Sequence, residues 1–415
     1  MAARRPRVAP QHARRVPPLR RALRSAVRVT AIAVTVLLVS GAGVAAVWLH
    51  TLDAEVASHA VALHQSPEQQ RAQPLSGAFN VLLVGADNAS GQHGFGASRQ
   101  STQNDVDILL HVAADHRSGV VLSMPRDTIV DHPACVADDG SQVPAEAAQP
   151  LNIDLMRGGL GCVVTTVQHL TGLTIPYAAE FSFQGTIAMA DAVGGVPVCV
   201  SRAIDDPDSG LRLPAGRSVV TGRTALAYLR DRHGVGDGSD LARISSQQAY
   251  MSSLLRQATS EGTLTDPAKL FALAEQTAKN VSLSTSMAKP DVLVGMMAAL
   301  LQVPLHDLSL VQLPTVPYPA NPNKVMPDPA LTAVLLKHLQ HDTPVVLARG
   351  THGYATDVTS TGSTTRSTAS PSPSASASGS PSGGATTAPT KHDAPISGLS
   401  GQTASESTCS VAASG

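Results

Sequence analysis

Apolar residues along this chain form short runs separated by glycine, proline and charged residues. Runs of strand length predict buried strands, and longer stretches with a period near 3.6 residues predict helices. The expected strands are residues 79–85, 108–112, 120–123, 177–183, 196–200, 308–313 and 344–347. The expected helices are residues 155–170, 184–193, 221–232, 241–260, 266–279 and 291–301. This alternation predicts an α/β fold with a central mixed sheet sandwiched by helices.

The most hydrophobic stretch, residues 29–49, is uncharged and follows a segment with nine arginines and no acidic residue. As a helix it would reach roughly 30 Å, the thickness of a hydrocarbon core. The preceding arginines place residues 1–28 in the cytoplasm and everything after the anchor outside the cell, as a single-pass protein of the cell membrane. A cleaved signal peptide is the alternative, because small residues at 40–42 and 45–46 follow a shorter apolar core.

Composition divides the rest of the chain into three parts. Residues 50–77 form a polar linker, and residues 78–350 provide enough apolar sequence for one large extracytoplasmic domain. Residues 351–415 are rich in serine, threonine, proline and glycine, so we expect a disordered tail that cannot bury enough surface to fold. The formal net charge of −1 gives no reason to expect a nucleic-acid partner.

The four cysteines agree with an oxidising compartment. Cys135 and Cys162 flank a short excursion, and a disulfide there would stabilise the fold by about 3.5 kcal/mol through loop entropy. Cys199 lies in an apolar run and could equally be a buried free thiol, while Cys409 lies in the tail. No cysteine or histidine spacing typical of zinc sites occurs.

Charged residues are scarce, at 15% of the chain, yet several stand beside predicted strand or helix ends. A charge next to a buried segment is costly unless it pairs with another charge, a metal or a ligand. In open α/β folds such strand ends meet in one ligand cleft. Carboxylates with phosphate oxygens suit Mg²⁺, and the guanidinium fork suits a diphosphate. The candidate residues are Asp87, Asp105, Arg126, Asp127, Arg230, Arg232 and Arg243.

Each of these signals also has a purely structural interpretation. Pro-Arg-Asp at residues 125–127 is commonly a turn with an internal ion pair, and two arginines near a helix end commonly stabilise its dipole. Asp240 is expected to be an N-cap, and His233 to satisfy a local hydrogen bond. The glycine-rich residues 91–96 lack the order of a dinucleotide fingerprint and predict a flexible rim loop.

Seven segments carry recognisable motifs: FNVLLVGAD (79–87), NDVDILLH (104–111), SMPRD (123–127), LTG (170–172), DAVGGV (191–196), ALAYLRDRH (225–233) and DLARISSQQ (240–248). Their order and spacing resemble the LytR-CpsA-Psr family. The resemblance covers about residues 78–260. The acidic stretch at residues 205–211 and the cysteines resemble those of actinobacterial members.

The resemblance implies an Mg²⁺-dependent phosphotransferase that moves a glycopolymer from a polyprenyl diphosphate carrier to peptidoglycan, forming a phosphodiester. Arg126, Arg230, Arg232 and Arg243 match the positions where the family binds the diphosphate. The resemblance also assigns roles to three carboxylates. Asp87 and Asp105 match its metal-linked carboxylates, and Asp127 would orient Arg126 or assist the incoming hydroxyl.

The chain also departs from the family pattern. Ser246 replaces a usual second arginine, Ala242 replaces a glycine, and Asp107 adds an acid beside Asp105. Pro150 and Leu151 stand where a lysine usually precedes Asn152. Weaker cationic contact with the diphosphate is therefore expected. The alternatives are a polyprenyl diphosphate phosphohydrolase using water as acceptor, and a non-catalytic envelope protein that binds lipid-linked glycans.

Overall fold

The structure, a computed structural model, describes residues 51, 54–65, 75–87, 102–259, 267–348, 353, 355–358 and 394–413. The predicted cytoplasmic segment and membrane anchor, residues 1–49, lie outside the described residues, as do the glycine-rich residues 91–96. Within the described ranges, no helix is both long and apolar enough to cross a membrane. Residues 55–415 belong to one compact unit, which contains all the elements below.

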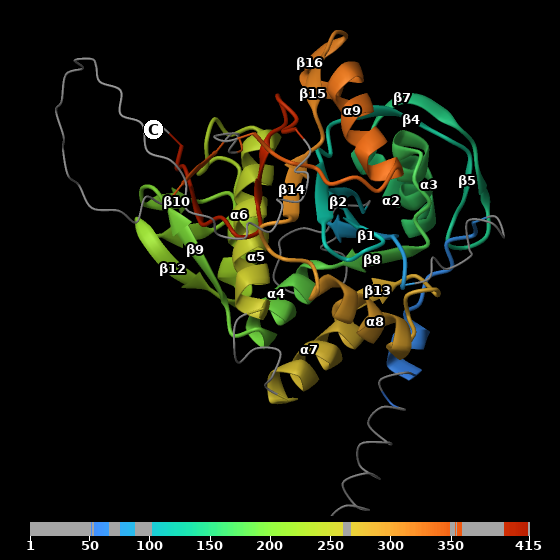
Figure 1. The fold of residues 1–415 in the computed structure, drawn as a ribbon, viewed down its shortest axis with the longest axis horizontal. Coiled ribbons are helices and arrows are strands. Elements are labelled where there is room, and N and C mark those ends of the chain that lie inside the picture. Colours follow the sequence, from blue (N-terminus) through green and yellow to red (C-terminus); the bar gives the residue numbers. More distant parts are fainter. Residues whose placement is uncertain are drawn as a thin grey trace, which may run out of the picture. The chain divides into compact units, whose positions relative to one another are not determined.

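A seven-stranded mixed sheet forms the centre of this unit, in the order β13-β8-β1-β2-β3-β14-β18 (Figure 1). Strand β2 is antiparallel to both of its neighbours, β1 and β3, whereas β8 runs parallel to β1 and β14 runs parallel to β3. The predicted mixed sheet is confirmed. Its strands are β1 (Phe79–Ala86), β2 (Asn104–Val112), β3 (Gly119–Met124), β8 (Tyr177–Phe181), β13 (Val281–Leu283), β14 (Leu308–Gln312) and β18 (Gly401–Thr403).

Helices cover both faces of the sheet, as the apolar periodicity predicts. On one face, Leu82 and Leu122 of the sheet share a buried cluster with Val163 and Leu335 of the covering helices. On the other face, Leu310 shares a cluster with helices α6 and α8. The first layer contains α2 (Asp154–Gly158), α3 (Leu160–Thr171) and α9 (Pro329–Gln340). The second contains α6 (Asp240–Thr259) and α8 (Pro290–Leu300).

A four-stranded sheet, in the order β12-β9-β19-β17, lies beside α6. Its inner face packs Val198 against Ala225 and Tyr228 of α5 and Tyr250 of α6. Residues 196–200 therefore form the predicted strand, but in this second sheet. The elements are β9 (Val196–Val200), β12 (Gly216–Val220), β17 (Thr356–Val358), β19 (Thr408–Ser410), α4 (Phe183–Ala192), α5 (Gly222–Arg230) and α7 (Pro267–Asn280).

Short hairpins and turns complete the described elements, and the sequence pattern did not predict them. They are β4 (Ile129–His132), β5 (Cys135–Val136), β6 (Gln142–Val143), β7 (Glu146–Pro150), η1 (Leu151–Ile153), β10 (Ile204–Asp206), β11 (Leu211–Leu213), β15 (Thr315–Tyr318) and β16 (Asn321–Pro327).

The end of the chain is ordered, which corrects the prediction of a disordered tail for residues 355–358 and 394–413. Residues 394–413, here termed the C-terminal strap, add β18 to the central sheet and β19 to the second sheet (Figure 1). A disulfide joins Cys409 of the strap to Cys199 of β9, which answers a question that the sequence left open. The strap is ordered because two sheet edges, the disulfide and buried Leu399 compensate for its polar composition.

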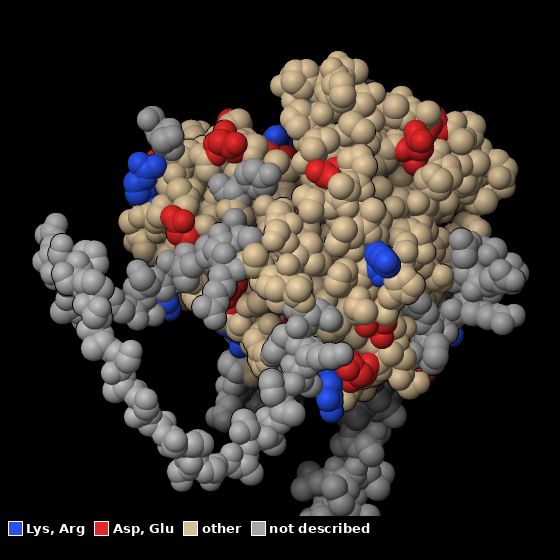
Figure 2. Space-filling model, turned by 45° about the horizontal axis from the view of Figure 1, so that its top comes forward, with Lys and Arg blue, Asp and Glu red and all other residues tan. Residues whose placement is uncertain are grey.

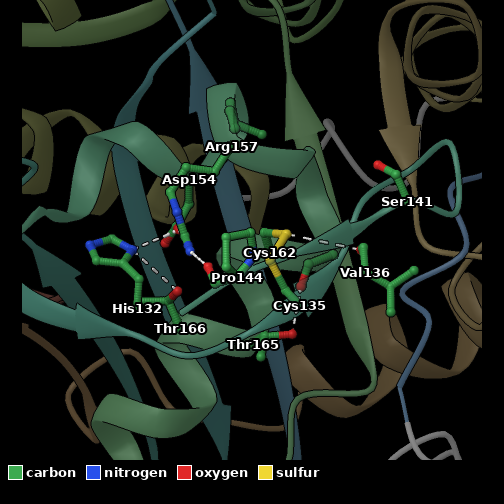
Figure 3. Close-up of a disulfide and its surroundings, with 12 residues drawn as sticks. His132, Cys135, Val136, Ser141, Pro144, Asp154, Arg157, Cys162, Thr165 and Thr166 are labelled. Carbon is green, nitrogen blue, oxygen red and sulfur yellow. Dashed lines mark hydrogen bonds and ion pairs between the residues drawn. A yellow bond between two sulfur atoms is a disulfide. The ribbon is translucent and has the colours of Figure 1, made fainter. Parts of the chain in front are cut away.

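The predicted disulfide between Cys135 and Cys162 is confirmed and ties β5 to α3 (Figure 3). Beside it lies a buried polar cluster. His132 Nδ1 is 2.7 Å from Asp154 Oδ1, and Nη1 of Arg157 donates to the same oxygen at 2.8 Å. These buried contacts fix the position of α2 against β4.

Two predicted elements differ from the structure. The helix expected at residues 155–170 is interrupted at Gly159, whose φ of 82° requires glycine. Residues 344–347 do not join the central sheet as a strand, because β18 of the strap occupies the edge beside β14. They contribute only a single bridge, from Leu347 to Ile396.

Candidate functional site

Charged residues meet at one end of the central strands. Because β1, β2 and β3 are antiparallel neighbours, the end of β1, the start of β2 and the end of β3 share one edge. Asp105 is the extra residue of a bulge in β2, since Gly85 pairs with Val106 and Ala86 with Asn104. A bulge redirects the side chain of its unpaired residue, and here it brings Asp105 to Arg126, the second residue after the end of β3.

Arg126 is the centre of this cluster. Its Nη1 donates a short hydrogen bond to the Asp105 carboxylate, and its Nε lies 3.8 Å from carboxylate oxygens of both Asp127 and Asp240. Burial opposes the charge of this guanidinium, but the three carboxylates, Asp105 foremost, raise its pKa above the ordinary value. Arg126 is therefore a permanent cation held in a fixed position.

Arg243 joins the cluster from the first turn of α6. Its Nη2 lies 2.6 Å from an Asp240 carboxylate oxygen and donates to the backbone carbonyl of Asp105 at 2.9 Å. Asp240 was expected to be a simple N-cap, but its buried carboxylate lies between two arginines. Burial lowers the pKa of Arg243; the carboxylates of Asp240 and Asp105 oppose this decrease, and nearby Arg126 and Arg232 add to it. Such crowding of cations favours binding of an anion.

Arg230 and Arg232 reach the same place from the end of α5. The guanidinium of Arg230 stacks over the ring of Phe183, 4.5 Å from its centroid, which orients it by a cation–π contact. The Nε atoms of Arg126, Arg232 and Arg243 are buried and have no hydrogen-bond acceptor in the described part of the chain. Several buried donors with one sign of charge are suited to an oxyanion.

A cleft of about 210 Å³ connects these groups. Figure 2 shows one face of the molecule, on which charged side chains occur singly or in small groups among uncharged residues. The cleft, in contrast, collects four guanidiniums from three distant segments. The sequence-predicted residues that line it are Asp105, Arg126, Arg230, Arg232 and Arg243.

Two predicted site residues do not line this cleft. Asp127 is engaged by Lys324, whose Nζ donates to its Oδ1. Asp87 is buried directly after β1 and accepts a hydrogen bond from the backbone N–H of Gln103 at 2.8 Å. Asp127 is thus placed to orient Arg126 and not to face a ligand in the cleft.

A pair of carboxyl groups behind the arginines was missed by sequence reasoning. Burial, and then a hydrogen bond shared with Asp206, raise the pKa of Asp231 to about 7. Asp206 lines the cleft, and although burial opposes it, hydrogen bonds from Ser209 and Asp231 lower its pKa. The protonation of this pair changes the charge beside Arg230 and Arg232. Asp206 lies in the acidic run at residues 205–208 and Asp231 in the ALAYLRDRH segment, but nothing in the sequence indicates that the two lie together.

The extra acid Asp107 is accounted for by its neighbour. Asn104 Nδ2 donates to both Asp107 carboxylate oxygens, at 2.9 and 2.8 Å, and to the carbonyl of Leu151. Burial raises the pKa of Asp107 well above its usual range. Asp107 is therefore a structural group beneath the cleft.

The C-terminal strap holds the segment that follows Arg232. The N–H of Gly236 donates to the carbonyl of Val411 at 2.8 Å, and the N–H of Ala413 donates to the carbonyl of Gly234 at 2.9 Å. Two carbonyls at the strap end accept from Arg202. Residues near the end of the chain thus support the cleft.

Comparison with known proteins agrees with this arrangement. The model of the LytR_cpsA_psr family matches residues 46–328, about two thirds of the chain. The chain belongs to the LytR-CpsA-Psr family.

Relatives of this family member include the cell wall biosynthesis protein LcpA of Corynebacterium glutamicum, 35% identical over 281 residues, which are 60% of this chain and 52% of that protein. The polyisoprenyl-teichoic acid–peptidoglycan teichoic acid transferase TagU of Oceanobacillus iheyensis is 28% identical over 194 residues, 47% of this chain and 56% of that protein. The matched region spans about half the length of these curated relatives.

Solved structures share the fold. The structure of TagT bound to LI-WTA superimposes with a TM-score of 0.51 at 20% identity, covering 65% of this chain and 92% of that chain. A LytR-Csp2A-Psr enzyme from Actinomyces oris gives a TM-score of 0.50 at 20% identity, covering 64% and 90%. At this identity the likeness is one of fold.

Among the described residues of this LytR-CpsA-Psr protein, no group of three or more His, Cys, Asp or Glu side chains has metal-binding geometry. A metal at this cleft would therefore take part of its coordination from phosphate oxygens and water. Asp87 and Asp105 stand at the same end of the neighbouring strands β1 and β2, because Ala86 pairs with Asn104. One or two carboxylates completed by phosphate oxygens and water match the preference of Mg²⁺.

Proposed function

We propose that this protein transfers a glycopolymer from a polyprenyl diphosphate carrier to peptidoglycan. The observation that carries the proposal is the cleft in which four guanidiniums converge on one space beside the carboxylate of Asp105. Family membership supports it, and so do relatives named polyisoprenyl-teichoic acid–peptidoglycan teichoic acid transferase. TagT, which shares the fold, has been solved with LI-WTA bound.

In this proposal the arginines hold the diphosphate and stabilise its charge. A hydroxyl oxygen of peptidoglycan attacks the phosphorus atom attached to the glycan, and the hydroxyl proton is released to water. The bond from that phosphorus to the bridging oxygen breaks, so polyprenyl phosphate leaves and a phosphodiester joins glycan to acceptor. Negative charge grows on the bridging oxygen, and the guanidiniums of Arg126 and Arg243 stabilise it without rearrangement because carboxylates already fix them.

Arg230 and Arg232 bind the same diphosphate from the opposite wall. Arg230 is oriented by Phe183, and Asp127 orients Arg126 from outside the cleft with Lys324 as its second partner. Mg²⁺ is the metal that this donor set suits, with Asp105 and Asp87 as its protein ligands, and it would neutralise phosphate charge when bound.

We place the reaction at the outer face of the cell membrane. The proposed anchor is residues 29–49, with residues 1–28 in the cytoplasm. A polyprenyl carrier resides in the same membrane, so an anchored cleft meets its donor in two dimensions.

The test uses the full chain in detergent micelles with Mg²⁺, lipid-linked glycan and peptidoglycan. We expect glycan to become wall-bound and polyprenyl phosphate to accumulate in equal amount. Arg126→Ala should lower the transfer rate at least a hundredfold, about 3 kcal/mol of transition-state stabilisation. Arg212→Ala is the matched control, since Arg212 is exposed and lies outside the cleft.

Three other outcomes would redirect the proposal. Glycan released into solution would mean a polyprenyl diphosphate phosphohydrolase. Donor binding without turnover would mean a non-catalytic glycan-binding protein. An unchanged rate in Arg126→Ala would remove this arginine from the mechanism.

A further inference from the structure

A second and larger cavity, of about 340 Å³, lies between α6 and the second sheet. None of its lining residues lines the cleft described above. Its walls come from β9, β12, α5, α6 and the C-terminal strap, and include Cys199, Arg217, Arg256 and Thr408. The cavity therefore depends on the strap and on the position of Cys199 opposite it.

Two arginines give this cavity its charge. Arg217 of β12 and Arg256 of α6 both line it, and no carboxylate is among its lining residues. Within the described ranges neither arginine forms an ion pair. Burial lowers the pKa of Arg256, and the charge of Arg217 on the same cavity wall lowers it further.

Nearby groups fix Arg256 without neutralising it. Its Nη1 donates to the backbone carbonyls of Ala404, at 3.1 Å, and Glu406. The Glu406 carboxylate accepts instead from the backbone N–H of Thr403 at 2.8 Å and does not line the cavity. The arginine is thus held by neutral carbonyls with its positive charge unbalanced.

Two adjacent guanidiniums repel each other, and an anion between them removes that repulsion and gains charge-assisted hydrogen bonds. Guanidinium forks match the tetrahedral oxygens of phosphate in particular. The volume lies within the range of small-molecule sites, so it has room for a phosphate with a sugar attached. The hydroxyls of Tyr228 and Thr408 are held by Ser410 and Gln402, which gives this wall fixed polar groups.

We propose that this cavity is a second oxyanion site, which binds a phosphate group carried by a sugar between Arg217 and Arg256. Arg256 follows Arg243 by thirteen positions in α6, so the two sites lie about 20 Å apart along that helix. If the proposed transfer function holds, the second site binds a phosphate further along the donor's glycan chain. Binding of phosphate itself does not depend on that function.

The test counts bound phosphate by equilibrium dialysis of the full chain in detergent micelles with radiolabelled orthophosphate. We expect two classes of site in the unaltered protein. Arg217→Gln and Arg256→Gln should each weaken one class at least tenfold and leave the other within twofold. Arg212→Gln, which replaces an exposed arginine outside both cavities, should retain both classes.

Competitors identify the chemistry. N-acetylglucosamine 1-phosphate should displace phosphate from the second site, whereas acetate and N-acetylglucosamine should not. Displacement by acetate at equal concentration would overturn the assignment to phosphate.

Arg217→Gln is the decisive variant, because Arg217 is exposed and its replacement should leave the thermal midpoint unchanged. Arg256 donates to the backbone of the strap, so its replacement also removes a structural contact. Phosphate binding by Arg217→Gln equal to that of the unaltered protein would refute the site. A failure of glycan transfer in the unaltered protein would refute the proposed function and leave the dialysis result standing.

Discussion

The disulfide between Cys199 and Cys409 should be worth more to stability than the one between Cys135 and Cys162. A disulfide restricts the unfolded chain, and the loop-entropy model gives a gain that grows with the logarithm of loop length. The sequence separations are 210 and 27 residues. They correspond to about 5.4 and about 3.5 kcal/mol, a difference of about 2 kcal/mol.

The assay is urea unfolding of the full chain in detergent micelles. The double variants Cys199→Ala/Cys409→Ala and Cys135→Ala/Cys162→Ala are each compared with the unaltered protein under oxidising conditions. The same comparison under reducing conditions measures the packing cost of losing the sulfur atoms, which is subtracted. This correction matters because Cys162 is fully buried.

After that correction, we expect the long-loop variant to lose about 2 kcal/mol more than the short-loop variant. An equal or smaller loss would refute the loop-entropy reasoning and would mean that the strap is held mainly by its strand pairings. The long-loop variant should also transfer glycan more slowly. In the strap, the N–H of Ala413 donates to the carbonyl of Gly234, which lies two residues after Arg232.

Three further predictions concern groups around the cleft. Asp231 has a pKa of about 7 in the folded protein, against about 4 when unfolded, so the free energy of unfolding falls as pH rises from about 4 to 7. Asp231→Asn should remove this fall and stabilise the protein at pH 8 by about 1–2 kcal/mol in urea unfolding. An unchanged pH profile would contradict the raised pKa. Phe183→Leu should weaken pyrophosphate binding about fivefold in dialysis, because Arg230 loses its cation–π contact of about 1 kcal/mol. Unchanged affinity would mean that this contact does not position Arg230. Lys324→Met should cost about 1 kcal/mol of stability, because Asp127 loses an ion-pair partner. It should leave pyrophosphate affinity within twofold. A tenfold loss of affinity would place Lys324 in contact with the donor.

Local sequence patterns predicted much of the fold. The strands β1, β2, β3, β8 and β14 and the helices α4 to α8 were predicted within a few residues, because apolar period and turn residues act over short range. Helix α9 and the hairpin of β15 and β16 were missed. The tail was also misjudged, since its order comes from sheet edges and a disulfide partner 210 residues away.

The candidate site divides in the same way. The residue types and spacing of Arg126, Arg230, Arg232 and Arg243 were enough to suggest a diphosphate cleft. The role of Asp240 could not be read from the sequence. It was predicted to be an N-cap, yet it pairs with Arg243 across one helical turn and approaches Arg126 from another element.

By itself the sequence determined which segments are strands and helices, which family the motifs match, and which charged residues require a counter-charge or a ligand. These properties depend on side-chain type and local order. Only the tertiary structure decided that a bulge turns Asp105 toward Arg126, that Asp127 faces Lys324 outside the cleft, and that the chain's end closes a second cationic cavity. These are distances between residues far apart in sequence, and they are fixed by packing of the whole unit, which no local pattern encodes.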